Sequence, residues 1–234
     1  MGAPDTGAQG GGRGDGLGRR MALGSAAGMA ANAVFLATRL ALTPFILHYV
    51  TLADFGLWSV CFIILSYAGL SAFGVQNAYV KYAAEYREQG DREATNALLG
   101  TGMTLMGGLC LAIYLALYAG VPWVMDRFGI EPGLKDLAGF MILGTAAVFL
   151  GDLVFGAFRN LLEGVQEIAL VRGVWLAATL VETGLVFVFL PLGLGIRGVF
   201  WAYAVKTGFE LAVGAVLAFR RLPGLRLRPG VDRR

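Results

Sequence analysis

Five ionisable side chains lie inside apolar stretches of this 234-residue chain, and their chemistry is the most informative feature of the sequence. They are Arg39, Asp152, Glu182, Lys206 and Glu210. A charged side chain is expensive to place in hydrocarbon, so such residues either line a water-filled path or pair with one another. Two interpretations follow: a charged cavity near the middle of a membrane, or ion pairs that hold helices together.

The spacing of these residues places some of them on shared helix faces. Asn32 and Arg39 are seven residues apart, which puts them on one face together with Ser25. Lys206 and Glu210 are four residues apart and can partly neutralise each other on a helix. We therefore take six residues as candidate substrate contacts: Asn32, Arg39, Asp152, Glu182, Lys206 and Glu210.

The residue types that usually carry catalysis or hold metals are sparse. The only histidine is His48, and the two cysteines, Cys61 and Cys110, lie inside apolar runs. These residues cannot build a zinc site or a histidine-based catalytic triad. Residues 193–198 space three glycines as a dinucleotide fingerprint does, but they join two apolar runs, so we predict only a tight turn. We expect no catalytic residue, no metal, no cofactor and no nucleic-acid partner, so an enzyme is not predicted.

The composition indicates that membrane-spanning helices position the buried charges. Apolar residues make up 57% of the chain and charged residues 15%, with a mean hydropathy of +0.66. Soluble domains are about half apolar and about a quarter charged, so a soluble enzyme is excluded. Six continuous apolar runs are each long enough to cross about 30 Å of hydrocarbon as a helix. They cover residues 22–49, 55–75, 97–121, 137–158, 170–192 and 198–219. The predicted fold class is an all-α, polytopic membrane protein with six transmembrane helices.

Basic residues are distributed unevenly over the connections between these runs. With six alternating spans, fourteen Lys and Arg residues fall on one side and three on the other. Basic residues favour the cytoplasmic side, so both termini are predicted to be cytoplasmic. The expected organisation is a disordered cytoplasmic tail over residues 1–20, a six-helix lobe over 21–221 and a basic cytoplasmic tail over 222–234.

Residues 77–96, between the second and third runs, carry a stripe of tyrosines. Tyr79, Tyr82 and Tyr86 recur at helical spacing, with charged residues between them. This pattern predicts an amphipathic helix that leaves the second span and lies at the cytoplasmic interface. Both an ordinary connecting helix and a moving linker are compatible with it.

Several short strings occur in an order that resembles a known family. They are LTPFIL (42–47), DFGLW (54–58), YAGL (67–70), FGVQN (73–77), VKYAAEY (80–86) and LGLG (192–195). Over residues 21–221 the chain resembles the N-terminal half of the Wzx-like polysaccharide and oligosaccharide flippases. These flippases belong to the multidrug/oligosaccharidyl-lipid/polysaccharide exporter superfamily.

The resemblance implies one lobe of a MATE-like flippase fold, in which six helices pack against a second six-helix lobe. It implies movement of an undecaprenyl-diphosphate-linked oligosaccharide from the cytoplasmic to the outer leaflet of the bacterial inner membrane, among membrane lipids. Arg39 and Lys206 are the cations that could contact the diphosphate. The sequence covers one lobe, so the second lobe is expected from a separate chain or from a second copy in a homodimer.

Two other functions stay open at the level of sequence. One is a non-transporting or truncated membrane subunit in which the buried charges have a structural role. The other is a multidrug or cation antiporter-type lobe, which would favour acidic residues in its cavity. Arg39 and Lys206 favour an anionic substrate over a cationic one.

Overall fold

The computed structural model describes residues 28–29, 32–33, 35–127, 129 and 132–226, and this part of the chain contains helices and no strands. Residues 35–49 form a helix, which we call the first helix. It is followed by α2 (Leu52–Gln89), α3 (Arg92–Arg127), the 3-10 turn η1 (Pro132–Leu134), α4 (Lys135–Phe155), α5 (Ala157–Gly164), α6 (Ile168–Phe189) and α7 (Gly195–Arg221). The all-α prediction is confirmed for these residues.

Four helical segments are long and apolar enough to cross a membrane. They are Arg92–Arg127, Pro132–Gly164, Ile168–Phe189 and Gly195–Arg221. The two remaining predicted spans are not among these four. The first predicted run lies partly outside the described residues, and the apolar part of α2 covers only Leu52–Tyr67. The structure therefore supports a membrane protein with four candidate spans, and the number six stays a prediction.

The helices α2 and α3 form a hairpin that is longer than a bilayer is thick. With 38 and 36 residues, they extend for about 57 and about 54 Å, compared with about 30 Å of hydrocarbon. Gly90 ends α2 in the left-handed region at φ 70°, and the Asp91 carboxylate accepts a hydrogen bond from the Ala94 N–H at the start of α3. Residues 77–89 thus continue α2 without a break, instead of forming a separate helix at the interface.

The two long helices approach closely where a tyrosine faces a glycine. A Cβ atom on Gly102 would lie 2.1 Å from the Tyr79 hydroxyl oxygen, so only glycine fits there. Tyr79 is consequently buried, whereas Tyr82 is exposed and its ring stacks on Tyr86 at 5.9 Å. The predicted tyrosine stripe therefore divides into the buried Tyr79, the exposed Tyr82 and the partly buried Tyr86.

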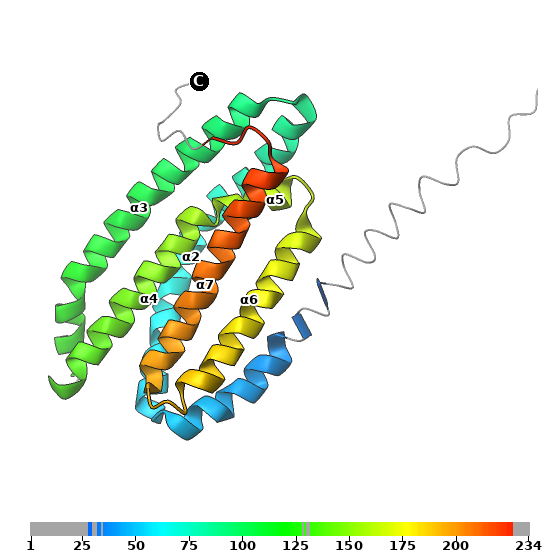
Figure 1. Cartoon of the computed structure of the whole chain (residues 1–234). Coiled ribbons are helices and arrows are strands. Elements are labelled where there is room, and N and C mark those ends of the chain that lie inside the picture. Colours follow the sequence, from blue (N-terminus) through cyan, green and yellow to red (C-terminus); the bar gives the residue numbers. More distant parts are fainter. Residues whose placement is uncertain (1–27, 30–31, 34, 128, 130–131, 227–234) are drawn as a thin grey trace, which may run out of the picture.

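The connections gather at the two ends of the bundle (Figure 1). One end combines the Gly90–Asp91 turn, Val165 after α5 and residues 222–225 after α7, which line a common cavity. We call it the basic end, because the predicted basic side of the chain maps to it. The opposite end carries the tight turn between α6 and α7, in which Gly193 has φ 81° and Gly195 has φ 55°. The tight turn predicted from the glycine spacing is confirmed.

The first helix runs along α6 in the same direction. Residue numbers increase along both helices through three side-chain contacts: Phe35 with Trp175, Arg39 with Glu182 and Phe45 with Phe187. Two parallel helices must enter the bundle from the same end, which agrees with the alternation of spans predicted from sequence. The first helix thus brings Arg39 to the side of α6 on which Glu182 lies.

Candidate functional site

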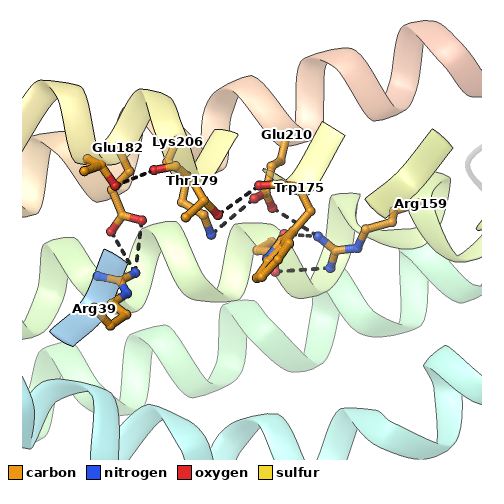
Figure 2. Close-up of polar contacts among 9 residues, drawn as sticks. Arg39, Arg159, Trp175, Thr179, Glu182, Lys206 and Glu210 are labelled. Atoms are coloured by element: carbon orange, nitrogen blue, oxygen red, sulfur yellow. Dashed lines mark hydrogen bonds and ion pairs between the residues drawn. The ribbon is translucent and has the colours of Figure 1, made fainter. Parts of the chain in front are cut away.

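The predicted site residues divide into two groups of charges. Arg39 and Glu182 form the first group, which we call the peripheral pair. Asp152, Lys206 and Glu210 belong to the second group, which is completed by Arg159 and which we call the four-charge cluster. Figure 2 shows the peripheral pair and Arg159 at opposite ends of the row, with Lys206 and Glu210 between them.

The peripheral pair joins the first helix to α6. The Arg39 Nη2 atom donates to both carboxylate oxygens of Glu182, at 3.1 and 3.0 Å. The Glu182 side chain is only 4% exposed, whereas that of Arg39 is 41% exposed. Both bonds use the same nitrogen, so Glu182 leaves the Nη1 and Nε donors of the guanidinium unused.

Aromatic rings flank the peripheral pair toward the start of the first helix. The Arg39 guanidinium carbon lies 5.2 Å from the centre of the Phe35 ring, and the Phe35 and Trp175 ring centres are also 5.2 Å apart. A ring face attracts a cation within about 6 Å. Asn32 is helical and exposed, and its predicted stripe partner Ser25 lies outside the described residues.

The four-charge cluster is closed by a residue that the sequence analysis did not select. The Arg159 Nη1 atom lies 3.4 Å from Asp152 Oδ1 and 3.4 Å from Glu210 Oε2. Lys206 Nζ lies 3.2 Å from Glu210 Oε1, which confirms the pairing predicted from their spacing. Each of the two cations therefore contacts Glu210, and Arg159 also contacts Asp152.

The joint between α4 and α5 places Arg159 beside Asp152. A Cβ atom on Gly156 would lie 2.5 Å from the Asp152 carbonyl oxygen and 3.2 Å from Arg159 Nη2. A side chain at position 156 would collide with the Asp152 carbonyl oxygen and with the Arg159 guanidinium, so glycine is required at this joint. The short helix α5 then packs on α2, where a Cβ atom on Gly164 would lie 2.6 Å from the Val80 carbonyl oxygen.

Sequence reasoning missed Arg159 because the fourth apolar run ends at residue 158 and Arg159 was assigned to a loop. The formal charges of the buried residues could have indicated that a cation was missing from the set. The five buried ionisable residues comprise three acids and two bases, so one cation is needed for neutrality. With Arg159 included, the peripheral pair and the four-charge cluster each sum to zero formal charge.

Aromatic side chains cover the four-charge cluster on the side of α2. Tyr203 lies one turn before Lys206 on α7, and it is 9% exposed. Its ring centre lies 5.1 Å from that of Phe62 and 5.9 Å from that of Trp58. This packing joins α7 to α2 one turn from Lys206, whose side chain is 15% exposed compared with 41% for Arg39.

The chemistry that this arrangement offers is electrostatic. In the part of the chain that the structure describes, no group of three or more His, Cys, Asp or Glu side chains is placed to hold a metal ion. A half-exposed guanidinium with unused donors can bind a planar or tetrahedral oxyanion through several charge-assisted hydrogen bonds. Of the two groups of charges, the peripheral pair is the one that has such donors to offer.

Comparison with known proteins adds no assignment, because no family model, no curated protein and no solved structure matches the chain. The function has to be inferred from the two groups of charges and their surroundings.

Proposed function

We propose that the chain is one lobe of a membrane transporter that moves a lipid-linked oligosaccharide across the bacterial inner membrane, without catalysing a covalent step. The observation that carries the proposal is Arg39, a 41% exposed guanidinium on an apolar helix, bonded to Glu182 through one nitrogen only. In hydrocarbon such a group requires water, a carboxylate or an anionic ligand.

The shape of the guanidinium favours a phosphate-containing substrate. Its planar fork of donors suits phosphate oxygens better than the point charge of a lysine does. In this proposal Arg39 exchanges part of its contact with Glu182 for contact with the diphosphate of the lipid carrier. Lys206 is held by Glu210 at 3.2 Å and is 15% exposed, so it has a lesser role than Arg39.

The proposal includes two further helices in the membrane and a second lobe. The first helix and the apolar part of α2 would complete six spans with the four candidates. Asn32 is exposed and Arg39 is half-exposed on the first helix, and polar groups within a membrane face protein or water rather than lipid. A second six-helix lobe, from a separate chain or a second copy, would cover this face.

The orientation of the lobe has its own test. The basic end is proposed to be cytoplasmic, which places Thr51 on the outer side, and the Thr51 hydroxyl caps the exposed start of α2. A cysteine at Thr51 in a Cys61→Ala, Cys110→Ala background should react with a membrane-impermeant maleimide added to intact cells. A cysteine at Arg220 should react only in inverted vesicles. The reverse labelling would overturn the orientation.

The function is tested by surface glycan per unit of membrane-inserted protein, in a strain that lacks the wild-type gene. Arg39→Ala should abolish export while the protein stays in the membrane. Arg39→Lys should keep insertion and lower export, because a lysine presents a point charge in place of the fork. If Arg39→Ala exports glycan at the wild-type level, Arg39 does not contact the substrate.

One observation favours a second function, that of a non-transporting membrane subunit. Every ionisable residue in the two groups has an oppositely charged partner within 3.4 Å. Complete pairing is what purely structural ion pairs would require. For that function Arg39→Ala should lower the level of inserted protein, and the exchanged pair Arg39→Glu with Glu182→Arg should restore it.

A further inference from the structure

A cavity at the basic end is separate from both groups of charges and independent of the proposed transport function. It has a volume of about 250 Å³ and lies between the α2–α3 turn, the α5–α6 connection and the segment after α7. Three arginines line it, Arg87, Arg92 and Arg221, together with a single acidic residue, Asp91. A small cavity with this excess of guanidinium groups is suited to an anion.

The charges of the cavity are only partly neutralised from within the chain. Arg221 lies 3.3 Å from Glu167, and Arg87 donates to the Val165 carbonyl oxygen. Among the described residues, no carboxylate lies within ion-pair distance of Arg87 or Arg92. The Asp91 carboxylate is engaged by the Ala94 N–H at 2.9 Å. Arg92 is thus the guanidinium most available to a ligand.

The cavity wall formed by the segment after α7 is held in place by hydrogen bonds of the Asn96 side chain. The Asn96 amide donates to the Gly224 carbonyl oxygen at 3.1 Å and accepts from the Arg226 N–H at 2.8 Å. Leu225, between these contacts, is 8% exposed and joins the core that includes Leu99. The segment after α7 is therefore folded back across the start of α3, and it forms part of the cavity lining.

The position of the cavity favours a lipid as the source of the anion. It lies where α6 begins at Ile168 and α7 ends at Arg221, which is where apolar helices give way to charged residues. Ile168 follows the lining residue Val165 by three positions and is 48% exposed, and Phe219 precedes the lining residue Arg221 by two positions and is 43% exposed, so apolar side chains available to acyl chains lie close in sequence to the cavity lining. Basic pockets between membrane helices bind the headgroups of anionic lipids. We propose that this cavity binds the phosphate of an anionic phospholipid headgroup, with Arg92 as the principal contact.

The test measures lipid binding to the full chain in neutral detergent by native mass spectrometry. Dioleoyl-phosphatidylglycerol should bind to the wild type more tightly than dioleoyl-phosphatidylcholine does. Arg92→Gln should weaken phosphatidylglycerol binding by about fivefold, the effect of about one basic residue at a membrane surface. Arg220→Gln is the matched control, because it removes an exposed arginine of the same end that does not line the cavity.

A second variant keeps the test decisive if Arg92→Gln alters folding. Thr95 lines the cavity in the first turn of α3, and Thr95→Glu adds a carboxylate while keeping all three arginines. It should lower phosphatidylglycerol binding at least as much as Arg92→Gln. Wild-type binding by both variants, or equal losses in Arg92→Gln and Arg220→Gln, would overturn the site. Inorganic phosphate binding as tightly as the lipid would overturn the lipid as its ligand.

Discussion

The peripheral pair and the four-charge cluster contain the same kinds of residue but differ in how completely they are enclosed. Arg39 has one acidic partner and is 41% exposed, whereas Arg159 contacts two carboxylates and is 28% exposed. The peripheral pair joins one helix to another, while the four-charge cluster connects α4, α5 and α7. Opening the peripheral pair exposes one buried carboxylate, and opening the cluster removes the ion pairs that link three helices.

This difference indicates separate roles for the two groups. A buried ion pair is weak support for stability, but removing one partner leaves an uncompensated charge that is strongly destabilising. The four-charge cluster therefore tolerates little change and fixes the arrangement of α4, α5 and α7. The peripheral pair has a guanidinium that can turn toward water or a ligand, so under the proposed function it is the group that contacts the substrate.

The largest effect is expected from Arg159→Gln. The substitution leaves Asp152 and Glu210 with one cation, Lys206, between them, and Lys206 contacts only Glu210. We expect a loss of about 3 kcal/mol in the free energy of unfolding, the range for breaking a buried pair. Thermal unfolding in detergent and the yield of monodisperse protein measure it.

Two variants control for this prediction. Arg172→Gln removes an exposed arginine near the start of α6 and should leave the unfolding temperature unchanged. Adding Asp152→Asn to Arg159→Gln restores charge balance and should recover part of the lost stability. An Arg159→Gln protein as stable as Arg172→Gln would show that the four-charge cluster does not hold the helices together.

A smaller loss is expected from Gly156→Ala, which disturbs the joint that positions Arg159. Its Cβ atom would lie 2.5 Å from the Asp152 carbonyl oxygen, so α5 must shift. Overpacking of this kind costs about 1–3 kcal/mol. Gly151→Ala, in the preceding helix α4, is the control because nothing lies within 4 Å of its Cβ position. Equal unfolding temperatures for both variants would contradict the tight joint.

The smallest effects are expected at the peripheral pair, and they should be unequal. Arg39→Gln leaves the 4% exposed carboxylate of Glu182 unpaired, with an expected loss of about 1–2 kcal/mol. Glu182→Gln leaves a guanidinium that can turn to water, so it should lose less than about 1 kcal/mol. Unfolding of the two variants side by side measures the difference. A larger loss from Glu182→Gln would mean that Arg39 cannot leave its partner.

The helical class and the pairing of Lys206 with Glu210 could be predicted from local patterns in the sequence. Both depend on hydropathy or on spacing within one helix. The Glu182 partner of Arg39 is 143 residues away in sequence and the Glu210 partner of Arg159 is 51 residues away, so no local spacing contains these two contacts, whereas Asp152 and Arg159 are only seven residues apart. The continuity of α2 through residue 89 was also not predictable, because a polar surface does not show where a long helix leaves the membrane.

The cavity at the basic end illustrates the same limit on a larger scale. Its lining comes from three connections that the sequence treats as separate loops, and they meet only because the helices alternate in direction. The predicted uneven distribution of basic residues gave the correct set of connections for this end. This distribution did not indicate that the Asn96 side chain would hydrogen-bond to the segment after α7 and hold it against the start of α3.

The most direct test of the central claim is export by the neutral double variant Arg39→Gln with Glu182→Gln. Removing both members of the peripheral pair leaves no buried charge unpaired, so insertion and unfolding temperature should stay close to wild type. If Arg39 contacts the substrate, surface glycan per inserted molecule should fall by at least about tenfold, the loss expected for a charge-assisted contact. Wild-type export by this double variant would contradict the account and leave the peripheral pair with a structural role only.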